Sequence, residues 1–264
     1  MGFRSAFVNQ LKTIPSKLPS PVKRSGHAII DGLDARWRHW RFAQHVRAFR
    51  ATPAAFFDSR RLAAMHWAWG NENWSADAGY LEALARRMAR TTGAVLECGS
   101  GLTTIVLGVL AERRGVQVLS LEQDAWWASY VQSELTRLHI TQVELVHTPL
   151  IAHDDFMWFD VARVKFPYSF ELVVCDGPAI YGHPEPYQSA WRVGLLSVLR
   201  DHGVRADEIL LDDAEDPRLG SLRARWERQH DFATQIAQTA TGSYLVARPA
   251  GLDGGLGARA GRTL

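Results

Sequence analysis

From residue 94 onward, the chain alternates short apolar runs with longer stretches in which apolar residues recur at helical spacing. This alternation predicts a parallel β-sheet with helices on its faces. The expected strands are residues 94–98, 116–121, 143–146, 170–175, 208–211, 233–237 and 243–247. The expected helices are residues 103–113, 125–138, 187–200 and 219–229. The last two strands are separated by only a short connection, so we expect them to pair antiparallel.

The first third of the chain has a different pattern. Residues 27–57 place apolar side chains at helical spacing among arginines, which predicts one or two amphipathic helices. The segment WAWGNENW at 67–74 interrupts this pattern, and residues 75–90 are expected to form a helix with Ser75 as its N-cap. We therefore expect a basic arm at 1–26, a helical extension rich in Trp and Arg at 27–75, an α/β domain at 76–249 and a disordered Gly-rich tail at 250–264.

Composition narrows the class of protein. The chain has 264 residues, 47% of them apolar and 22% charged, which is typical of a globular protein with a sizeable core. Its longest apolar runs, such as 105–110, fall far short of the ~20 residues that a membrane span needs. The two cysteines, Cys98 and Cys175, lie inside apolar stretches, which favours buried thiols and a cytoplasmic protein without a signal peptide.

The net charge of +2 conceals an uneven distribution. Residues 1–50 carry ten basic and two acidic side chains, whereas the rest of the chain has more acidic than basic ones. A basic, aromatic segment suits an anionic membrane surface or an acidic partner, so we expect peripheral contact of this kind through residues 27–57. No base-reading module is visible, and on that ground no nucleic-acid partner is expected.

The most informative segment is VLECGSGLTT at 95–104, where a predicted strand enters a Gly-x-Gly turn that opens a helix. Glycine allows the backbone to turn sharply and to approach a ligand closely. A dinucleotide site would have a third glycine where this chain has Thr104. The carboxylate of Glu97, two residues before Gly99, would repel a phosphate and suits a cationic ligand.

The next predicted strand ends in Glu122, 21 residues after Gly101. An acid at about this distance accepts hydrogen bonds from ribose hydroxyls. A nucleoside that carries a positive group and no phosphate satisfies both observations, and S-adenosylmethionine is the common cofactor of that kind. Either Glu97 or Glu122 alone could be a helix cap or a surface acid; their placement around one turn favours the cofactor.

These motifs, together with CDGP at 175–178 and LLDDA at 210–214, resemble those of class I S-adenosylmethionine-dependent methyltransferases, and within them the small O-methyltransferase-like branch. The resemblance spans residues 76–248. It implies a Rossmann-like, mostly parallel seven-stranded sheet of order 3-2-1-4-5-7-6 with strand seven antiparallel. It also implies that Glu97, Gly99 and Gly101 line the methionyl side of the cofactor and that Glu122 holds its ribose.

Three carboxylates lie at the ends of the fourth and fifth predicted strands: Asp176, Asp212 and Asp213. They match in placement the acidic ligands of metal-dependent O-methyltransferases, where a divalent ion such as Mg²⁺ lowers the pKa of a substrate hydroxyl. The alternative is that Asp213 caps a turn and Asp176 orients the cofactor or a loop. Without a metal, His183 is the leading candidate for the base. Arg192 resembles an arginine common in this branch, and pairing with a strand-end carboxylate is its expected role.

Three functions remain open from the sequence. The first is methyl transfer to oxygen of a small-molecule or glycan-like acceptor, with Asp176 and His183 as catalytic residues. The second is a methyltransferase-fold protein that scaffolds a partner through its basic N-terminal helices. The third is a nicotinamide oxidoreductase, which Glu97 and Thr104 disfavour. The N-terminal tryptophans either cover the cofactor cleft or pack as core.

Overall fold

A computed structural model describes residues 33–71, 74–180 and 182–251. Its centre is a seven-stranded sheet of order β3-β2-β1-β7-β9-β11-β10. In this sheet β11 runs antiparallel to both of its neighbours, and the remaining pairs are parallel. Counted along the chain, this is the expected order 3-2-1-4-5-7-6 with strand seven antiparallel, so the prediction of fold class is confirmed.

The strands lie close to their expected positions. They are β1 (Val95–Cys98), β2 (Val118–Glu122), β3 (Val143–His147), β7 (Leu172–Cys175), β9 (Ile209–Leu211), β10 (Phe232–Gln238) and β11 (Ser243–Pro249). Every residue of β1, β2, β7 and β9 is buried, as expected of parallel strands covered on both faces.

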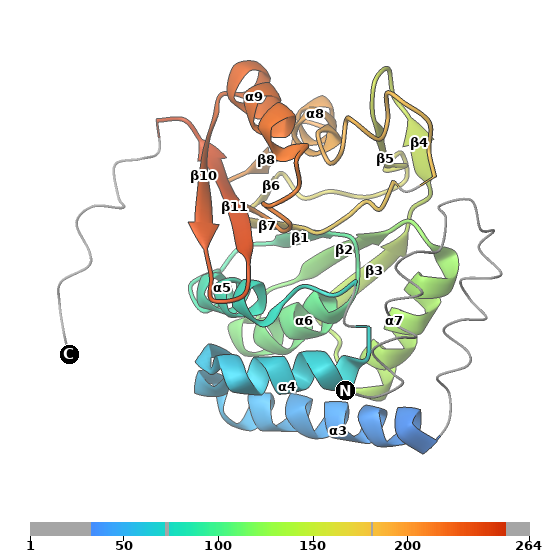
Figure 1. Cartoon of the computed structure of the whole chain (residues 1–264), viewed down its shortest axis with the longest axis vertical. Helices are drawn as coiled ribbons and strands as arrows, with labels where there is room; N and C mark the ends of the chain where they lie inside the picture. The colour runs from blue at the N-terminus through green and yellow to red at the C-terminus, as the bar shows by residue number, and fades with distance from the viewer. Residues whose placement is uncertain (1–32, 72–73, 181, 252–264) are drawn as a thin grey trace.

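Helices cover both faces of the sheet (Figure 1). On one face lie α5 (Ala78–Met88), α6 (Leu102–Arg114) and α7 (Ala125–Arg137), with α3 (Leu33–Ala51), η1 (Pro53–Phe57) and α4 (Ser59–Trp69) as a further layer outside them. On the other face lie α8 (Gly194–Asp201) and α9 (Leu219–His230). Two hydrophobic clusters, one for each face, form the core.

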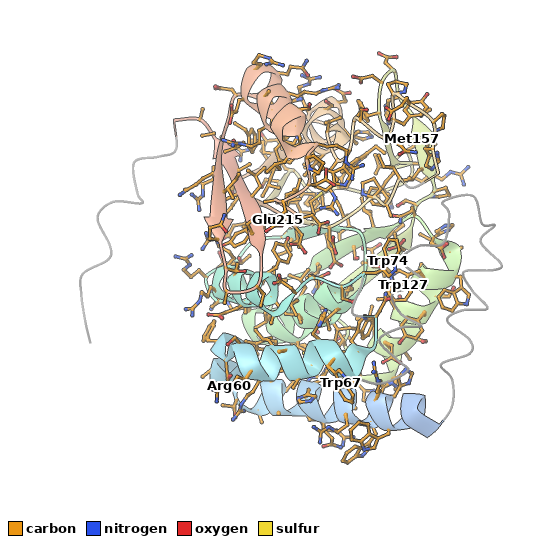
Figure 2. All side chains as sticks on the ribbon, in the orientation of Figure 1. Arg60, Trp67, Trp74, Trp127, Met157 and Glu215 are labelled. Atoms are coloured by element: carbon orange, nitrogen blue, oxygen red, sulfur yellow. The ribbon has the colours of Figure 1, made fainter. Side chains whose placement is uncertain are left out.

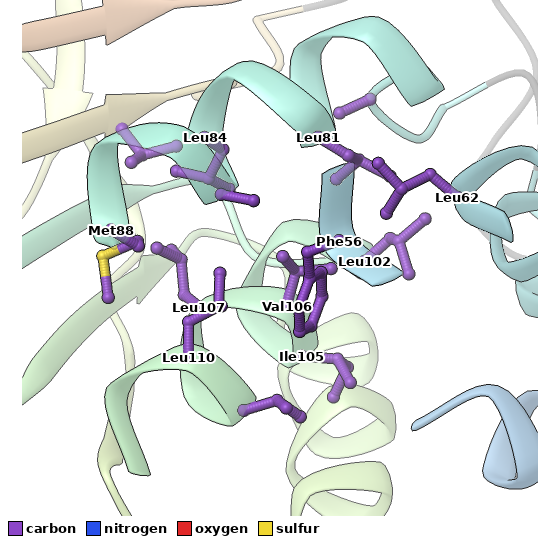
Figure 3. Packing of buried hydrophobic residues seen from close by; sticks show 14 of the residues in the cluster. Phe56, Leu62, Leu81, Leu84, Met88, Leu102, Ile105, Val106, Leu107 and Leu110 are labelled. Atoms are coloured by element: carbon purple, nitrogen blue, oxygen red, sulfur yellow. The ribbon is translucent and has the colours of Figure 1, made fainter. Parts of the chain in front are cut away.

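The extra layer is held by apolar packing. Ten consecutive residues of α6, 102–111, are buried, because the sheet lies on one side of this helix and the N-terminal helices on the other. Phe56, Leu62, Leu81 and Ile105 meet in this interface (Figure 3). Full burial of one such side chain contributes about 1.5–3 kcal/mol, so the N-terminal helices are part of the main core.

Several elements differ from the sequence-based expectations. The helix α5 begins at Ala78, and its N-cap is Asp77, whose Oδ1 accepts a hydrogen bond from the Tyr80 backbone amide at 2.8 Å, so Ser75 is not the cap. The helix α8 begins at Gly194 rather than at 187, because the preceding residues form turns and Arg192 has a φ of +53°.

Residues 59–69 lie within the helical extension expected at 27–75, and the structure forms the helix α4 there, with Asp58 as its N-cap. Two small strand pairs were not expected: β4 (Leu150–Ala152) with β5 (Met157–Phe159), and β6 (Ser169–Phe170) with β8 (Arg205–Ala206). Strands of two or three residues carry too little periodicity to be recognised in a sequence.

Outside the main sheet, the N-terminal predictions are tested only in part. The helix α3 and the short helix η1 match the helices expected within 27–57, whereas the arm at 1–26 and nearly all of the tail at 250–264 lie outside the described residues. Cys98 and Cys175 are buried free thiols on adjacent strands. Over the described part of the chain, no helix is both long and apolar enough to cross a bilayer.

Candidate functional site

The site lies where the strand order reverses, between β1 and β7. The chain leaves β1 toward β2 on one side and reaches β7 on the other, and in open α/β sheets ligands bind beyond the strand ends at this point. The loops after the two strands touch through their backbones. Gly99 has a φ of +91°, and a Cβ on it would come within 2.6 Å of the Gly177 nitrogen. Only glycine fits at Gly99, and this contact fixes the two loops against each other.

Glu97 is fully buried at the end of β1. Its Oε2 accepts hydrogen bonds from the hydroxyls of Ser120, at 2.6 Å, and Thr104, at 2.7 Å. Its Oε1 is buried and has no hydrogen-bond partner within the described structure. Burial raises the pKa of Glu97 to about 7, since no cation stands beside the carboxylate to compensate for lost hydration. An orphaned carboxylate oxygen in this position suits a positively charged ligand group.

Thr104 has a role that the sequence did not reveal. Its hydroxyl accepts a hydrogen bond from the Gly101 amide at 2.8 Å while donating to Glu97. The residue that replaces the third glycine of a dinucleotide motif therefore couples the Gly-x-Gly turn to the buried acid. Gly101 itself has no neighbour within 4 Å of the position of a Cβ, so the space beside it is open to a ligand.

Glu122 ties together the two loops at the ends of β1 and β2. Its Oε2 accepts hydrogen bonds from the backbone amide and hydroxyl of Ser100, at 2.9 and 2.8 Å, and its Oε1 accepts from the Asp124 amide at 2.9 Å. Desolvation still raises the pKa of Glu122 above its usual value, with these donors opposing the effect. Since an ionised carboxylate has about four lone-pair positions, these three donors leave capacity for one more.

Aromatic and polar side chains surround this loop. The indole Nε1 of Trp127 donates to the Ser100 carbonyl at 2.8 Å, while Trp126 is 46% exposed. Gln123 Oε1 and Thr148 Oγ1 are buried and have no hydrogen-bond partner in the described structure. Gln123 follows Glu122 in the sequence, and the Thr148 amide donates a hydrogen bond to the Glu122 carbonyl at 2.7 Å. Both unsatisfied side chains therefore belong to residues next to Glu122.

The carboxylates at the ends of β7 and β9 gather around one guanidinium. Arg192 Nη2 lies 3.1 Å from Asp176 Oδ1 and 3.0 Å from Asp213 Oδ2. It also donates to the Asp176 carbonyl, and Nη1 donates to the Asp212 carbonyl at 3.0 Å. The ring of Trp191 lies under the guanidinium, with Cζ 4.2 Å from its centroid. The predicted pairing of Arg192 with a strand-end carboxylate is therefore present.

The pKa values of this cluster reflect a balance of burial and charge. Desolvation raises the pKa of Asp176 despite the opposing effect of Arg192. Desolvation also raises the pKa of Asp212 strongly, and the neighbouring charges of Asp176 and Asp213 add to it. Burial disfavours the charged form of Arg192, but the acids around it raise its pKa, so the guanidinium remains protonated.

This arrangement does not fit the expected metal. The described residues hold no group of three His, Cys, Asp or Glu side chains arranged to bind an ion. The position between Asp176 and Asp213 is taken by Arg192, whose guanidinium supplies the compensating charge. The expectation that Asp176, Asp212 and Asp213 form a metal site is not supported.

His183 lies in the loop that follows the cis Gly177–Pro178 bond. Its backbone carbonyl accepts a hydrogen bond from the Gln188 side chain at 2.5 Å. In the described part of the chain, no hydrogen bond or ion pair joins its imidazole to Asp176, Asp212 or Asp213. The structure brings the three carboxylates together and leaves His183 as a separate group.

The residues of the first loop fit an S-adenosyl cofactor. Open space beside Gly101, the free Oε1 of Glu97 and the unsatisfied atoms of Gln123 and Thr148 all lie at or next to the loops after β1 to β3. Among the described residues, no salt bridge reaches Glu97 or Glu122, in contrast to Asp176 and Asp213, which Arg192 binds. The donor set therefore suits a ligand that is cationic at one end and rich in hydroxyl and ring nitrogen atoms at the other.

No family model matches the chain, and none of the curated proteins matches it. Solved structures do. The METTL16 methyltransferase domain is 11% identical, with a TM-score of 0.50 over 73% of this chain and 80% of that one. The N-terminal domain of human METTL16 in complex with SAH is 12% identical, with a TM-score of 0.47 over 73% and 82%. The hMettl16 catalytic domain in complex with MAT2A 3′UTR hairpin 6 is 13% identical, with a TM-score of 0.46 over 74% and 82%.

The last comparison corrects one expectation. We expected no nucleic-acid partner, yet a catalytic domain among the similar structures is described in complex with an RNA hairpin. Excluding nucleic acid because no base-reading module is visible was therefore wrong. At these identities the likeness establishes the architecture, and this chain has the Rossmann-like fold of class I methyltransferases.

Proposed function

We propose that the protein is an S-adenosylmethionine-dependent methyltransferase. The observation that carries this proposal is Glu97, a buried carboxylate with a free oxygen, set below an open Gly-x-Gly turn. A phosphate-bearing cofactor would be repelled there, whereas the positively charged amino acid end of S-adenosylmethionine would satisfy the acid. In this proposal Gly99 and Gly101 line the turn and Glu122 accepts hydrogen bonds from the ribose.

The cofactor supplies an activated methyl group, which an acceptor atom attacks in line. The chain's part is to hold the acceptor beyond the end of β7 and to remove its proton, with proximity supplying much of the acceleration. Asp176 is the base we favour, because it is 25% exposed and its raised pKa makes it a better proton acceptor than an ordinary aspartate. His183, half-buried in the adjoining loop, is the second candidate.

We propose oxygen of a small-molecule or glycan-like acceptor as the methylated atom. An alcohol or phenol requires a base close to the methyl donor, and Asp176 is adjacent to Gly177, whose backbone touches Gly99. The base and the cofactor turn are thus fixed to each other through backbone contact. Arg192 does not meet the acceptor in this scheme; it positions Asp176 and compensates its charge.

Calorimetry with S-adenosylhomocysteine and with NAD tests the cofactor. Wild-type protein should bind the first and not the second. The Glu97→Gln variant should lose about tenfold to hundredfold in affinity, the range that a hydrogen bond to a charged group is worth. Glu144→Gln, which removes an exposed carboxylate on β3, is the matched control and should bind normally. Binding of NAD alone would refute the proposal.

The catalytic roles need a second measurement. Transfer of labelled methyl groups to a panel of small alcohols, phenols and sugars should be lost in Asp176→Asn, while S-adenosylhomocysteine binding is kept. That result would separate an enzyme from a scaffold that only retains the cofactor pocket. Turnover that survives in Asp176→Asn and is lost in His183→Gln would assign the base to His183.

A further inference from the structure

The N-terminal helices present a surface that the proposed reaction does not use. Three tryptophans stand on it: Trp37 and Trp40 on α3 are 49% and 56% exposed, and Trp67 on α4 is 37% exposed. Burying a tryptophan normally contributes to stability, so rings left this open offer contact area to a partner. Figure 2 labels Trp67 on α4 and Trp127 on α7, in the half of the molecule that the N-terminal helices occupy.

Arginines are stacked onto these rings. Trp37 and Trp67 meet edge to face with their centroids 5.4 Å apart. The Arg38 guanidinium lies 4.5 Å above the Trp67 ring, and the Arg41 guanidinium lies 5.3 Å above the Trp37 ring. A guanidinium held flat against a ring keeps its edge available for hydrogen bonds, and Arg38 Nη1 uses part of that edge to donate to the Trp67 carbonyl at 3.3 Å. We call Trp37, Arg38, Trp40, Arg41 and Trp67 the tryptophan–arginine surface.

A second group of rings connects this surface to the candidate site. His39 on α3 lies 6.5 Å from Tyr130 on α7, centroid to centroid. The rings of Trp126 and Tyr130 are nearly parallel, with 9° between their planes and centroids 6.1 Å apart. Trp127, next in sequence, donates to Ser100 at the mouth of the cofactor turn. Half-buried rings of His39, Tyr130 and Trp127, with the exposed ring of Trp126 beside them, thus lie between α3 and the edge of the proposed cofactor site.

The charge of this region is one-sided. The helix α3 contains five arginines and one acidic residue, Asp34. Arg50 is bound to Glu112 at 2.6 Å and is therefore compensated. Arg47 is exposed, and no salt bridge in the described structure involves it. A partner complementary to this surface must be an anion, and an extended one, because the arginines are spread along α3.

The exposed apolar side chains of this region distinguish between two anionic partners, a lipid bilayer and a nucleic acid. Within residues 37–130, every large apolar side chain that the described structure exposes is aromatic: Trp37, Trp40, Phe57, Trp67, Trp74 and Trp126. No exposed Leu or Ile is present there to enter the acyl region of a bilayer. Flat rings beside cations instead match a partner that alternates flat bases with phosphates.

We propose that the tryptophan–arginine surface, together with Arg47 on α3 and Trp126 on α7, binds single-stranded nucleic acid. Bases stack on the exposed faces of Trp40 and Trp126, and phosphates contact Arg38, Arg41 and Arg47. A duplex keeps its bases stacked on one another, so it can use the arginines and not the rings. The proposal concerns binding alone, and it holds or fails independently of which acceptor is methylated.

Fluorescence anisotropy of the full chain with a labelled 20-nucleotide oligouridylate and a 20-base-pair RNA duplex tests it. The single strand should bind more tightly. Trp40→Ala should weaken its binding at least about fivefold, since one base–aromatic stack is worth ~1–3 kcal/mol, and Trp40→Phe should retain most of the affinity. Arg47→Gln should lower the dependence of binding on salt, the logarithmic slope falling by about 0.7 for one lost phosphate contact.

The matched control is an arginine stacked on an exposed aromatic ring elsewhere in the molecule. Tyr168 is 71% exposed, and the Arg205 guanidinium lies 4.8 Å above its ring, next to β6 and β8. Tyr168→Ala should leave binding unchanged. Equal loss in Tyr168→Ala, absence of binding in 50 mM salt, or duplex binding that Trp40→Ala leaves untouched would each overturn the proposal. So would Trp40-dependent sedimentation with anionic phosphatidylglycerol vesicles in the absence of strand binding.

Discussion

The buried carboxylates in the two halves of the candidate site have different kinds of partner. At the ends of β1 and β2, Glu97 and Glu122 are surrounded by neutral donors, namely hydroxyl groups and backbone amides. At the ends of β7 and β9, Asp176 and Asp213 are bound by the guanidinium of Arg192. Within the described part of the chain, one half of this sheet edge therefore has no ion pair to its acids, and the other half contains its own cation.

This difference indicates what each half still lacks. A carboxylate that is desolvated and unpaired is costly, and one that is paired with a buried cation is compensated inside the fold. The first half becomes complete when a positively charged ligand arrives, which is why we assign the cofactor there. The second half needs no further cation, and in our proposal Asp176, held by Arg192, is the group that acts on the acceptor.

The largest expected effect comes from removing the internal cation. Arg192→Met should lower the free energy of unfolding by about 3–5 kcal/mol, because it leaves several acids close together without a counter-charge. Urea denaturation at pH 7 measures this. The loss should shrink at low pH, where the acids are protonated. Arg200→Met, which removes an exposed arginine paired with Asp201, is the control, and an equally small effect in both variants would contradict the comparison.

The next effect belongs to the half without a cation. The pKa of Glu97 is about 7 in the folded protein and near 4.5 when unfolded, so the native state holds the proton more tightly. The stability of the cofactor-free protein should therefore fall as pH rises from 4.5 through 7, by up to about 3 kcal/mol from this group. The measurement is the difference between wild type and Glu97→Gln across this range. A constant difference would show that Glu97 keeps an ordinary pKa.

A pair of glycine variants separates folding from ligand contact. Gly99→Ala should destabilise the protein by about 1–3 kcal/mol, since the residue has a positive φ and its Cβ would meet the Gly177 backbone. Gly101→Ala should change stability little, because its Cβ would enter open space. Thermal unfolding measures the first effect. Calorimetry with S-adenosylhomocysteine should show weakened binding by Gly101→Ala, and unimpaired binding would place the ligand elsewhere.

The smallest effect is expected at Glu122, which already accepts three hydrogen bonds. Glu122→Gln should weaken S-adenosylhomocysteine binding by up to about tenfold, the value of one hydrogen bond to ribose. Calorimetry measures it, and Glu144→Gln is again the control. A larger loss accompanied by a lower melting temperature would mean that Glu122 acts by holding the Ser100 loop rather than by touching the ligand.

The sequence by itself determined the sheet and the position of the cofactor turn. Fully apolar strands such as Val95–Cys98 and the Gly-x-Gly turn that follows are local signals, and the alternation of strands and helices predicts a parallel sheet. The order of the strands came from the resemblance to class I methyltransferases. The short pairs β4–β5 and β6–β8, whose local signals are weak, were not predicted, and neither were the bounds of α4 within the helical extension. The choice of Asp77 over Ser75 as N-cap also depended on where α5 packs.

Only the tertiary structure decided the chemistry around the acids. Three aspartates at strand ends suggested a metal, because carboxylates in sequence do not reveal which cation they meet. Arg192 reaches them from a turn with positive φ, 16 residues after Asp176. Its pairing with one strand-end carboxylate was expected, but its place between Asp176 and Asp213, where a metal was expected, was not. Thr104 likewise looked like a missing glycine until its hydroxyl was seen between Gly101 and Glu97. The sequence shows which side chains carry a charge, but long-range packing decides which opposite charge lies beside each of them.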